Sequence, residues 1–395
     1  MRPPIDHSQP LGPSAGWVNL NVPHYALFTS GSQNGPGDSM KKLAVPGGIT
    51  MIVLALILLS PTEVIGADCS KVTTGLIPLP ELGRGLYQGH QGGLYPGGSN
   101  QAPGSYVSTG QAAARRIEPR SPSGGVDPHG KIVLMSIGMS NTTAEFSTFV
   151  IWAKQDLHRD SRVLLVDSAQ GGAAAENWSS PSAPPWTVAD QRLAAAGATE
   201  AQVQAIWLKQ ADPGPSGGFD AYVPKLEREL AAIVRIATGR YPNLQQVFVS
   251  PRTYGGYATT QLNPEPYAYE TGFADQWLVA QSVSQPSARP WVGWGPYLWT
   301  DGTRSGQPLS WTCQDVQPGD GTHPSVSGQQ KVAVMLGDFF DTSEFATWYR
   351  APAPQTSSRP VARWPLSQPL LIAVLVLVGL TVGVATFALG IHRLR

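Results

Sequence analysis

The chain has 395 residues, 42% of them hydrophobic, which is enough for one large or two ordinary domains with a buried core. Its formal net charge is zero, so no broad electrostatic attraction favours nucleic acid or another polyanion, and we expect no nucleic-acid partner. The 43 glycines and 36 prolines predict long irregular loops around the regular elements.

The N-terminal part contains a predicted export signal. Residues 1–39 are rich in Gly, Pro, Ser and Asn without periodicity, and we interpret them as disordered or as lying upstream of a true start at Met40. Residues 40–67 combine a basic start, a short apolar run and a small-residue end at Ala67, which is typical of a secretory signal peptide. Residues 68–130 are expected to wrap the following domain irregularly.

Strands and helices alternate in the predicted domain at 131–350. Lys131–Gly138 is a continuous apolar run typical of a buried strand, and Asn141-Thr142 with Glu145 resembles a capping box that opens the next helix. Residues 220–238 carry apolar side chains at helical spacing, and Gly239 is the expected stop. Four more strands are predicted at 162–167, 203–209, 246–250 and 291–297, and a last helix is predicted to open at Pro324.

This alternation predicts an α/β fold: a flavodoxin-like, three-layer α/β/α arrangement around a mainly parallel five-stranded sheet. Ligands of such sheets bind at the carboxyl ends of the strands. Four polar or flexible positions fall at predicted strand ends, namely Ser140, Gly171, Gln210 and Arg252.

A membrane anchor is predicted at the C-terminal end. Residues 369–391 are apolar over about the ~20 residues that a bilayer crossing requires, and the basic tail 392–395 follows directly. A polar, proline-rich linker at 351–368 precedes this transmembrane helix. The basic residues at both ends of the chain predict that the domain lies on the extracytoplasmic side of the cell membrane.

Ser140, His323 and Asp320 supply the groups for nucleophilic catalysis. A serine hydroxyl is a poor nucleophile at neutral pH unless a base lies within hydrogen-bond reach, and His323 is the best candidate among seven histidines. Asp320, three residues before it, would orient the imidazole. Either motif alone is more simply an ordinary turn, but the two together, on this framework, favour a hydrolase.

The tetrahedral oxyanion of such a reaction requires fixed hydrogen-bond donors. Gly171 and Gly172 follow the second strand and permit a backbone N–H to approach the reacting atoms. The carboxamide of Gln210, after the third strand, is a further candidate donor.

Four segments together resemble the SGNH hydrolases, the GDSL-type esterases. Gly138-Met-Ser140-Asn141 and Gly171-Gly172 with Glu176 and Trp178 resemble blocks of the sialate O-acetylesterase and acetylxylan esterase branch. Trp207 with Gln210 resembles a third block but is spaced one residue longer, and Asp320-Gly-Thr-His323 matches the terminal block.

The resemblance implies the SGNH fold and a role for each matching residue. Ser140 would be the nucleophile, His323 the base and Asp320 its support, and the N–H groups of Ser140 and Gly172 with Gln210 would form the oxyanion hole. The usual family has Gly-Asp-Ser in the first block and an Asn in the third, and this chain has neither.

The substrate is predicted less sharply. Asn141, Arg252, Tyr254 and Trp178 are candidate contacts, although turn residues of this composition are more often structural. A cluster of four tryptophans precedes the Asp-His loop, where the rings either stack on sugars or pack in the core. These tryptophans are Trp291, Trp294, Trp299 and Trp311.

Asn141 and Asn177 satisfy the glycosylation sequon, but both adjoin the expected site, and we interpret them as chance matches. Cys69 and Cys313 are enough for one disulfide, and sequence alone leaves their pairing open. No His, Cys or Asp cluster has ligand spacing, so neither a metal nor an organic cofactor is expected.

The leading hypothesis is a membrane-anchored extracytoplasmic serine esterase that removes short acyl groups, acetyl first among them, from carbohydrate. One alternative is an acyltransferase in which the same acyl-enzyme passes its group to a sugar. The other is a non-catalytic surface protein that keeps the fold and binds glycans.

Overall fold

A computed structural model of the protein describes residues 66–304 and 309–351. Residues 1–39, the predicted signal peptide except for its last two residues, the predicted linker after Ala351, the predicted transmembrane helix and the basic tail lie outside the described residues. Within the described ranges no helix is long and apolar enough to cross a bilayer.

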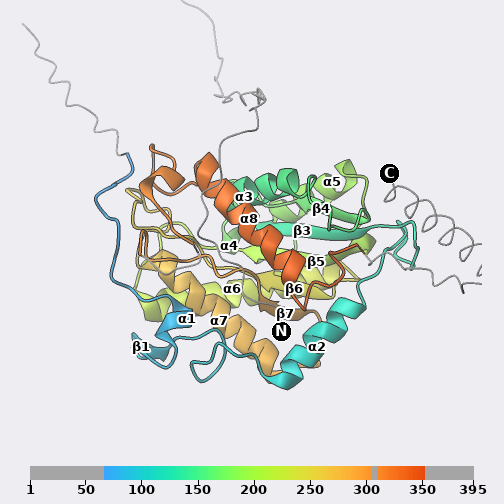
Figure 1. Ribbon diagram of the computed structural model, residues 1–395, viewed down its shortest axis with the longest axis horizontal. Helices are drawn as coiled ribbons and strands as arrows, with labels where there is room; N and C mark the ends of the chain where they lie inside the picture. Colours follow the sequence, from blue (N-terminus) through green and yellow to red (C-terminus); the bar gives the residue numbers. More distant parts are fainter. Residues whose placement is uncertain (1–65, 305–308, 352–395) are drawn as a thin grey trace, which may run out of the picture. The chain divides into compact units, whose positions relative to one another are not determined.

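The core is a parallel five-stranded sheet with the strand order β4-β3-β5-β6-β7 (Figure 1). The strands are β3 Ile132–Gly138, β4 Val163–Asp167, β5 Val203–Lys209, β6 Gln246–Val249 and β7 Trp291–Trp294. The first strand, β3, lies between β4 and β5, so that Leu134 is opposite Leu165 on one side and Ala205 on the other. Every residue of β3, β5, β6 and β7 is buried, as expected for a sheet covered on both faces.

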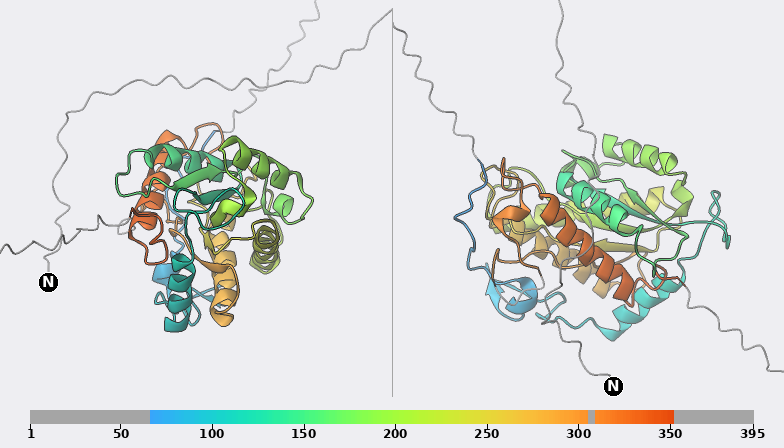
Figure 2. Two further views of the ribbon diagram at one scale, coloured as in Figure 1. Left: turned by 90° about the vertical axis from the view of Figure 1, so that its right-hand side faces the viewer. Right: turned by 45° about the horizontal axis from the view of Figure 1, so that its top comes forward.

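Helices cover both faces of the sheet and complete a three-layer α/β/α fold. Helices α3 (Ser140–Trp152) and α8 (Val326–Thr342) pack together in one layer. On the other side lie α5 (Pro184–Ala195), α6 (Phe219–Arg240) and α7 (Tyr267–Ser284), of which α6 and α7 pack on each other. Figure 2 shows the strands between the two groups of helices. Short turns of helix occur at α1 (Leu79–Leu82), α4 (Ala175–Trp178), η1 (Glu200–Gln202) and η2 (Cys313–Asp315).

Several element boundaries differ from the sequence predictions. The predicted capping box is wrong, because α3 begins at Ser140 without a side-chain cap and Glu145 binds a lysine instead. Gly239 does not stop α6, since the N–H of Tyr241 still donates to Ala237 O at 2.8 Å. The last helix begins at Val326, with Ser325 rather than Pro324 as its N-cap.

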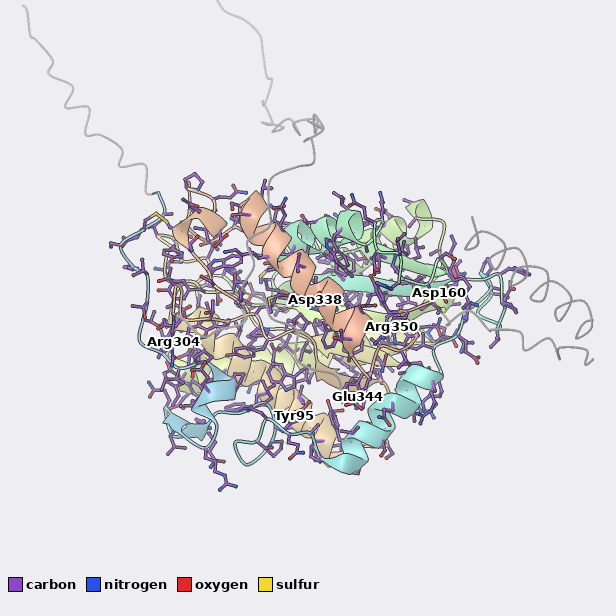
Figure 3. The ribbon with its side chains drawn as sticks, viewed as in Figure 1. Tyr95, Asp160, Arg304, Asp338, Glu344 and Arg350 are labelled. Carbon is purple, nitrogen blue, oxygen red and sulfur yellow. A yellow bond between two sulfur atoms is a disulfide. The ribbon has the colours of Figure 1, made fainter. Side chains whose placement is uncertain are left out.

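The segment before β3 is more regular than predicted. It contains the small β1/β2 hairpin (Leu86–Tyr87 and His90–Gln91) and the 12-residue helix α2 (Gly104–Arg115). Tyr106 of α2 donates its hydroxyl to Val292 O of β7 at 2.8 Å. Tyr95 packs edge to face against Tyr106, and Glu344 accepts a hydrogen bond from Gln111 (Figure 3). Helix α2 therefore covers the β7 edge of the sheet.

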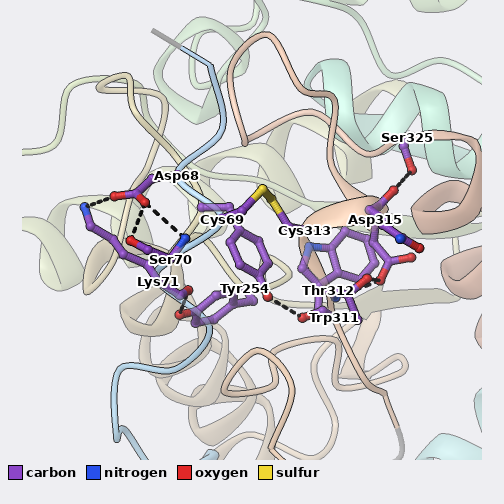
Figure 4. The surroundings of a disulfide bond; sticks show 12 residues. Asp68, Cys69, Ser70, Lys71, Tyr254, Trp311, Thr312, Cys313, Asp315 and Ser325 are labelled. Carbon is purple, nitrogen blue, oxygen red and sulfur yellow. Dashed lines mark hydrogen bonds and ion pairs between the residues drawn. A yellow bond between two sulfur atoms is a disulfide. The ribbon is translucent and has the colours of Figure 1, made fainter.

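A disulfide joins the start of the described chain to the region before the Asp-His loop (Figure 4). Cys69 and Cys313 are separated by 244 residues in the sequence and have a Cα–Cα distance of 5.4 Å. Nearby, Tyr254 donates its hydroxyl to Lys71 O at 2.7 Å and Tyr257 donates to Trp311 O at 3.1 Å. The disulfide ties the N-terminal segment to the region before His323, and the Tyr254 bond ties it to the loop after β6. The Tyr257 bond joins that loop to the same region before His323.

Candidate active site

Ser140 lies where β3 passes into α3, and the turn between them is tightly packed. A Cβ atom on Gly138 would lie 2.3 Å from Thr142 Oγ1 and 2.5 Å from Lys209 O, so no larger residue fits there. Thr142 donates its hydroxyl to Lys209 O at 2.7 Å, which ties the first turn of α3 to the end of β5. The side chain of Ser140 is thereby presented at the carboxyl edge of the sheet and at the positive end of a helix dipole.

The structure brings Ser140, His323 and Asp320 into one hydrogen-bonded chain. Ser140 Oγ lies 2.8 Å from Nε2 of His323, and Nδ1 of His323 lies 2.5 Å from Oδ2 of Asp320. The histidine and aspartate side chains are 29% and 23% exposed, so both remain partly accessible from solvent. This is the geometry in which a histidine can take the proton of a serine hydroxyl while a carboxylate orients the imidazole.

The loop that carries His323 is organised around the Asp320 carboxylate. Oδ1 of Asp320 accepts the backbone N–H groups of Thr322 at 2.8 Å and His323 at 3.0 Å. Burial raises the pKa of Asp320, but the hydrogen bonds from the His323 side chain and from these N–H groups outweigh it and leave the pKa below its usual value. Asn141 donates to Thr322 O at 2.9 Å and so links this loop to the serine turn.

A pocket of about 380 Å³ opens above these residues. Its wall is mixed: apolar side chains, strand-end glycines and a few polar groups. The residues that line it are Met139, Ser140, Asn141, Gly171, Gly172, Ala174, Ala211, Asp212, Pro213, Arg252, Leu262, Asn263, Thr322 and His323. The pocket therefore collects the carboxyl ends of β3, β4, β5 and β6, as the fold predicts.

Two backbone N–H groups beside the serine are free to donate. Ser140 is the first residue of α3, where a helix provides no internal acceptor. Gly172 is exposed and has a φ of +77°. In the described part of the chain no protein acceptor is found for the N–H of Ser140 or of Gly172. Gly171 also lines the pocket, and a Cβ there would lie 4.0 Å from Ser140 Cβ.

Gln210 does not line the pocket. It is 3% exposed, and its Nε2 donates to Ala173 O at 3.3 Å, while its Oε1 has no partner among the described residues. The carboxamide therefore binds the loop after β4 and does not reach the pocket. The pocket wall after β5 consists of Ala211, Asp212 and Pro213 instead. In the sequence, Trp207 and Gln210 are spaced one residue longer than in the block that they resemble, and this is the feature that accompanies the position of Gln210 outside the pocket.

Only two of the four predicted substrate contacts line the pocket. Asn141 and Arg252 do, at 1% and 3% exposure. Tyr254 and Trp178 do not, because Tyr254 bonds to Lys71 O and Trp178 is fully buried with its Nε1 donating to Ala173 O. The four tryptophans before the Asp-His loop are also buried, which favours packing over sugar stacking: Trp291, Trp294, Trp299 and Trp311.

The predicted Asn141 sequon is held inside the protein. The side chain is buried, and its amide nitrogen is bound to Thr322 O. Asn177 is exposed, with its Oδ1 accepting the N–H of Ala174.

Sequence reasoning missed a buried ion pair directly beneath the serine turn. Lys209 Nζ lies 2.6 Å and 2.5 Å from the two carboxylate oxygens of Glu145, and both side chains are fully buried. Burial lowers the pKa of Lys209 to about 8, although Glu145 raises it, and burial raises the pKa of Glu145. A lysine directly after the apolar run 205–208, with a glutamate on the earlier helix α3, was the signal for this pair.

One group of acidic residues in the described part of the chain has the spacing of a metal site. Glu176, Asp212 and Glu229 place carboxylate oxygens within 4.8 Å of one another. Lys225 Nζ lies 2.5 Å from Asp212, 3.0 Å from Glu229 and 3.4 Å from Glu176. The lysine ammonium therefore already contacts all three carboxylates and offsets one of their negative charges.

No protein-family model matches the chain, and no curated protein matches it. Solved structures do align with it at 12–14% identity. A protein from Streptococcus pneumonia, provisionally described as a platelet activating factor, has a TM-score of 0.35 and 14% identity over 59% of this chain and 92% of its own. A provisionally described acylhydrolase from Bacteroides fragilis has a TM-score of 0.33 and 12% identity, covering 60% and 97%.

A carbohydrate esterase of family 3 from Talaromyces cellulolyticus has a TM-score of 0.32 and 12% identity, covering 52% of this chain and 95% of its own. All three TM-scores are below 0.5. The function proposed below accordingly stands on the residues and geometry of this chain.

Proposed function

We propose that this protein is a serine ester hydrolase that removes short acyl groups, acetyl first among them, through a Ser140-His323-Asp320 acyl-enzyme mechanism. The observation that carries the proposal is the continuous contact from Ser140 Oγ through His323 to Asp320, at 2.8 Å and 2.5 Å, beside an open pocket. No other described serine has a histidine ring nitrogen as its hydrogen-bond partner.

The reaction follows from this geometry. Ser140 Oγ attacks the ester carbonyl carbon as its proton passes to Nε2 of His323, and Asp320 stabilises the imidazolium through Nδ1–H. The negative charge on the carbonyl oxygen is placed near the N–H groups of Ser140 and Gly172. Collapse expels the alcohol, which takes the proton from His323. Water, activated by the same imidazole, then releases the acid and restores Ser140.

The acyl group that we propose is short because the pocket is small. A volume of about 380 Å³ must accommodate part of the alcohol as well as the acyl chain. Met139, Ala174 and Leu262 provide an apolar wall against which a methyl or short alkyl group can pack. Carbohydrate as the alcohol part is supported by the motif resemblance of the sequence.

We also propose that the domain lies outside the cytoplasm, held by the C-terminal anchor predicted at residues 369–391. The disulfide between Cys69 and Cys313 supports this placement, because such bonds persist in oxidising compartments and are rare in the cytosol.

The test is hydrolysis of p-nitrophenyl acetate by the full chain in mild detergent. We expect Ser140→Ala and His323→Ala each to lower kcat/KM by about 10³-fold or more, because the members of a triad act as a unit. Ser108→Ala and His129→Ala, at exposed positions away from the pocket, are matched controls that retain activity. A Ser140→Ala variant as active as the wild type would refute the mechanism.

Fluorophosphonate labelling gives an independent readout of the nucleophile. The wild type should be labelled at Ser140 and the Ser140→Ala variant should not. Glycan binding without any labelling would instead support the non-catalytic alternative. If acylated sugar accumulates when a sugar acceptor is added, the acyl-enzyme serves a transferase rather than a hydrolase.

A further inference from the structure

Arg252 is a buried cation whose side chain has almost no protein partners. It follows β6, is 3% exposed and lines the same pocket as Ser140 and His323. Its Nη1 contacts Met139 Sδ at 3.8 Å, and its Nε has no partner. Within residues 66–304 and 309–351, no carboxylate forms an ion pair with this guanidinium. A guanidinium offers five N–H donors. The Nε–H of Arg252 is enclosed, Nη1 has only the weak contact with Met139, and no protein acceptor is found for Nη2 in the described structure.

The acidic groups around Arg252 are already bound to other donors. Burial lowers the pKa of Arg252. Electrostatic interactions with Glu145, Tyr222, Glu265 and Asp320 raise this pKa, but they do not outweigh burial. Asp212, which shares the pocket, is bound to Lys225. The other carboxylates accept hydrogen bonds from other residues. Glu145 accepts from Lys209 and Asp320 from His323. Glu265 accepts from the N–H groups of Gly255, Tyr269 and Trp299.

The three side chains Glu145, Lys209 and Arg252 beneath the pocket have a formal net charge of +1, which the carboxylates of Glu265 and Asp320 offset only from outside this group. If Lys209 and Glu145 are both ionised, their charges cancel and Arg252 remains. If the proton moves from Lys209 to Glu145, both become neutral and Arg252 again remains. The excess charge is therefore the same for either state of the pair, and it faces the pocket through Arg252.

Asn263 is a second buried polar side chain in the pocket wall. It is 2% exposed. Its Nδ2 donates to Tyr222 at 2.8 Å, whereas its Oδ1 has no partner in the described structure. Buried polar atoms are nearly always paired. Arg252 Nε and Asn263 Oδ1 are both enclosed by the protein, so a ligand in this pocket meets the terminal nitrogens of Arg252 instead.

We propose that Arg252 binds a carboxylate of the substrate, so that the preferred esters carry a negative charge close to the ester bond. A carboxylate matches the planar guanidinium fork and neutralises one positive charge. A phosphate monoester, with about −1.5 to −2 charges at neutral pH, exceeds the single charge available. Arg252 thereby sets specificity for the proposed esterase, and the position of the ester beside Ser140 is the part that rests on the proposed function.

Binding is measured separately from catalysis to test this proposal. Ser140→Ala protein is titrated calorimetrically with 4-acetoxybenzoate and its methyl ester, which differ by a carboxylate on the alcohol part. It is also titrated with mono-4-nitrophenyl succinate and its methyl ester, which differ by a carboxylate on the acyl part. We expect at least one acid to bind about tenfold or more tightly than its methyl ester, as a charge-assisted bidentate contact would produce.

Arg252→Met in the same background should abolish that preference, whereas Arg235→Met, an exposed arginine outside the pocket, should retain it. If Arg252→Met does not fold, Arg252→Lys carries the test, and the preference should fall at least about threefold because the fork is lost. No preference for either acid, or a preference that survives loss of the guanidinium, would overturn the proposal, as would tighter binding of 4-acetoxyphenyl phosphate than of 4-acetoxybenzoate.

Turnover of both acids and both methyl esters by protein that retains Ser140 then tests the proposed function independently. Absence of hydrolysis together with an intact binding preference would refute the esterase and leave the carboxylate site standing.

Discussion

The buried pair of Lys209 and Glu145 yields the sharpest stability prediction. In Lys209→Met the ammonium is replaced by an apolar side chain of similar length, and Glu145 keeps its carboxylate in a fully buried site. Removing one partner of a buried ion pair typically costs about 3–5 kcal/mol, because the remaining charge loses its direct partner. In Lys209→Met only the more distant Arg252 still favours the ionised carboxylate of Glu145. We expect that loss in the free energy of unfolding at pH 8.

The loss should be smaller in acid. Burial already raises the pKa of Glu145, and removing Lys209 raises it further, so Glu145 takes up a proton on folding. Its folded pKa then lies above its unfolded value, and the penalty is relieved as pH falls through the folded pKa. The relief is about 1.4 kcal/mol for each pH unit over which the folded variant holds the extra proton.

A second substitution separates charge from packing. Lys209→Met with Glu145→Leu removes both charges, and replacement of a buried pair by apolar residues is usually neutral or stabilising. We expect the double variant to recover most of the loss. Urea unfolding of the full chain in mild detergent, followed by tryptophan fluorescence at pH 5 and pH 8, measures all three proteins. A single variant that loses less than about 1 kcal/mol at pH 8, or a double variant less stable than the single one, would refute this reasoning.

Two further predictions concern the serine turn and a second buried carboxyl. Gly138→Ala should lower Tm by several degrees and kcat by about tenfold or more, because the new Cβ would lie 2.3 Å from Thr142 Oγ1 and displace the serine turn. Gly239→Ala in α6, where a Cβ meets nothing within 4 Å, is the control and should not destabilise. Burial raises the pKa of Glu265 to about 7, despite its three N–H donors, against an ordinary value of 4.5. Because the folded pKa is raised, stability is lost as pH rises from the unfolded value through the folded one, so Glu265→Gln should gain roughly 3 kcal/mol relative to wild type between pH 4 and pH 8. Urea titrations at both pH values measure it, and a difference independent of pH would contradict it.

The five strands could be predicted because each contains a short apolar run, and their alternation with helices predicted a mainly parallel sheet. The pattern of β3 continues to the glycine before Ser140, and the apolar spacing of α6 locates that helix to within two residues. Helix α7 had no such signal. In α7 most of the buried residues are not large apolar ones, and Glu270, Thr271, Asp275 and Gln276 are buried in it.

Contacts within one loop of the site could be predicted from the sequence. Contacts between segments far apart in the chain could not. Asp320 and His323 lie in one loop, so their hydrogen bond follows from a spacing of three residues. Other features depend on which neighbours the fold supplies: Gln210 lies outside the pocket, Tyr254 is buried, and Arg252 has no carboxylate partner among the described residues. A sequence pattern contains no information on those neighbours until the chain is packed.

The order of the elements along the chain has a consequence for biosynthesis. The nucleophile is attached to the first strand of the sheet, and its base lies 183 residues later, beyond the last strand. A ribosome that has completed β3 to β6 has made a serine without a partner. The proposed acyl transfer would therefore start only when nearly the whole domain has been synthesised. On the same proposal, a chain truncated before residue 323 would be inert toward the acyl esters of the cell that makes it.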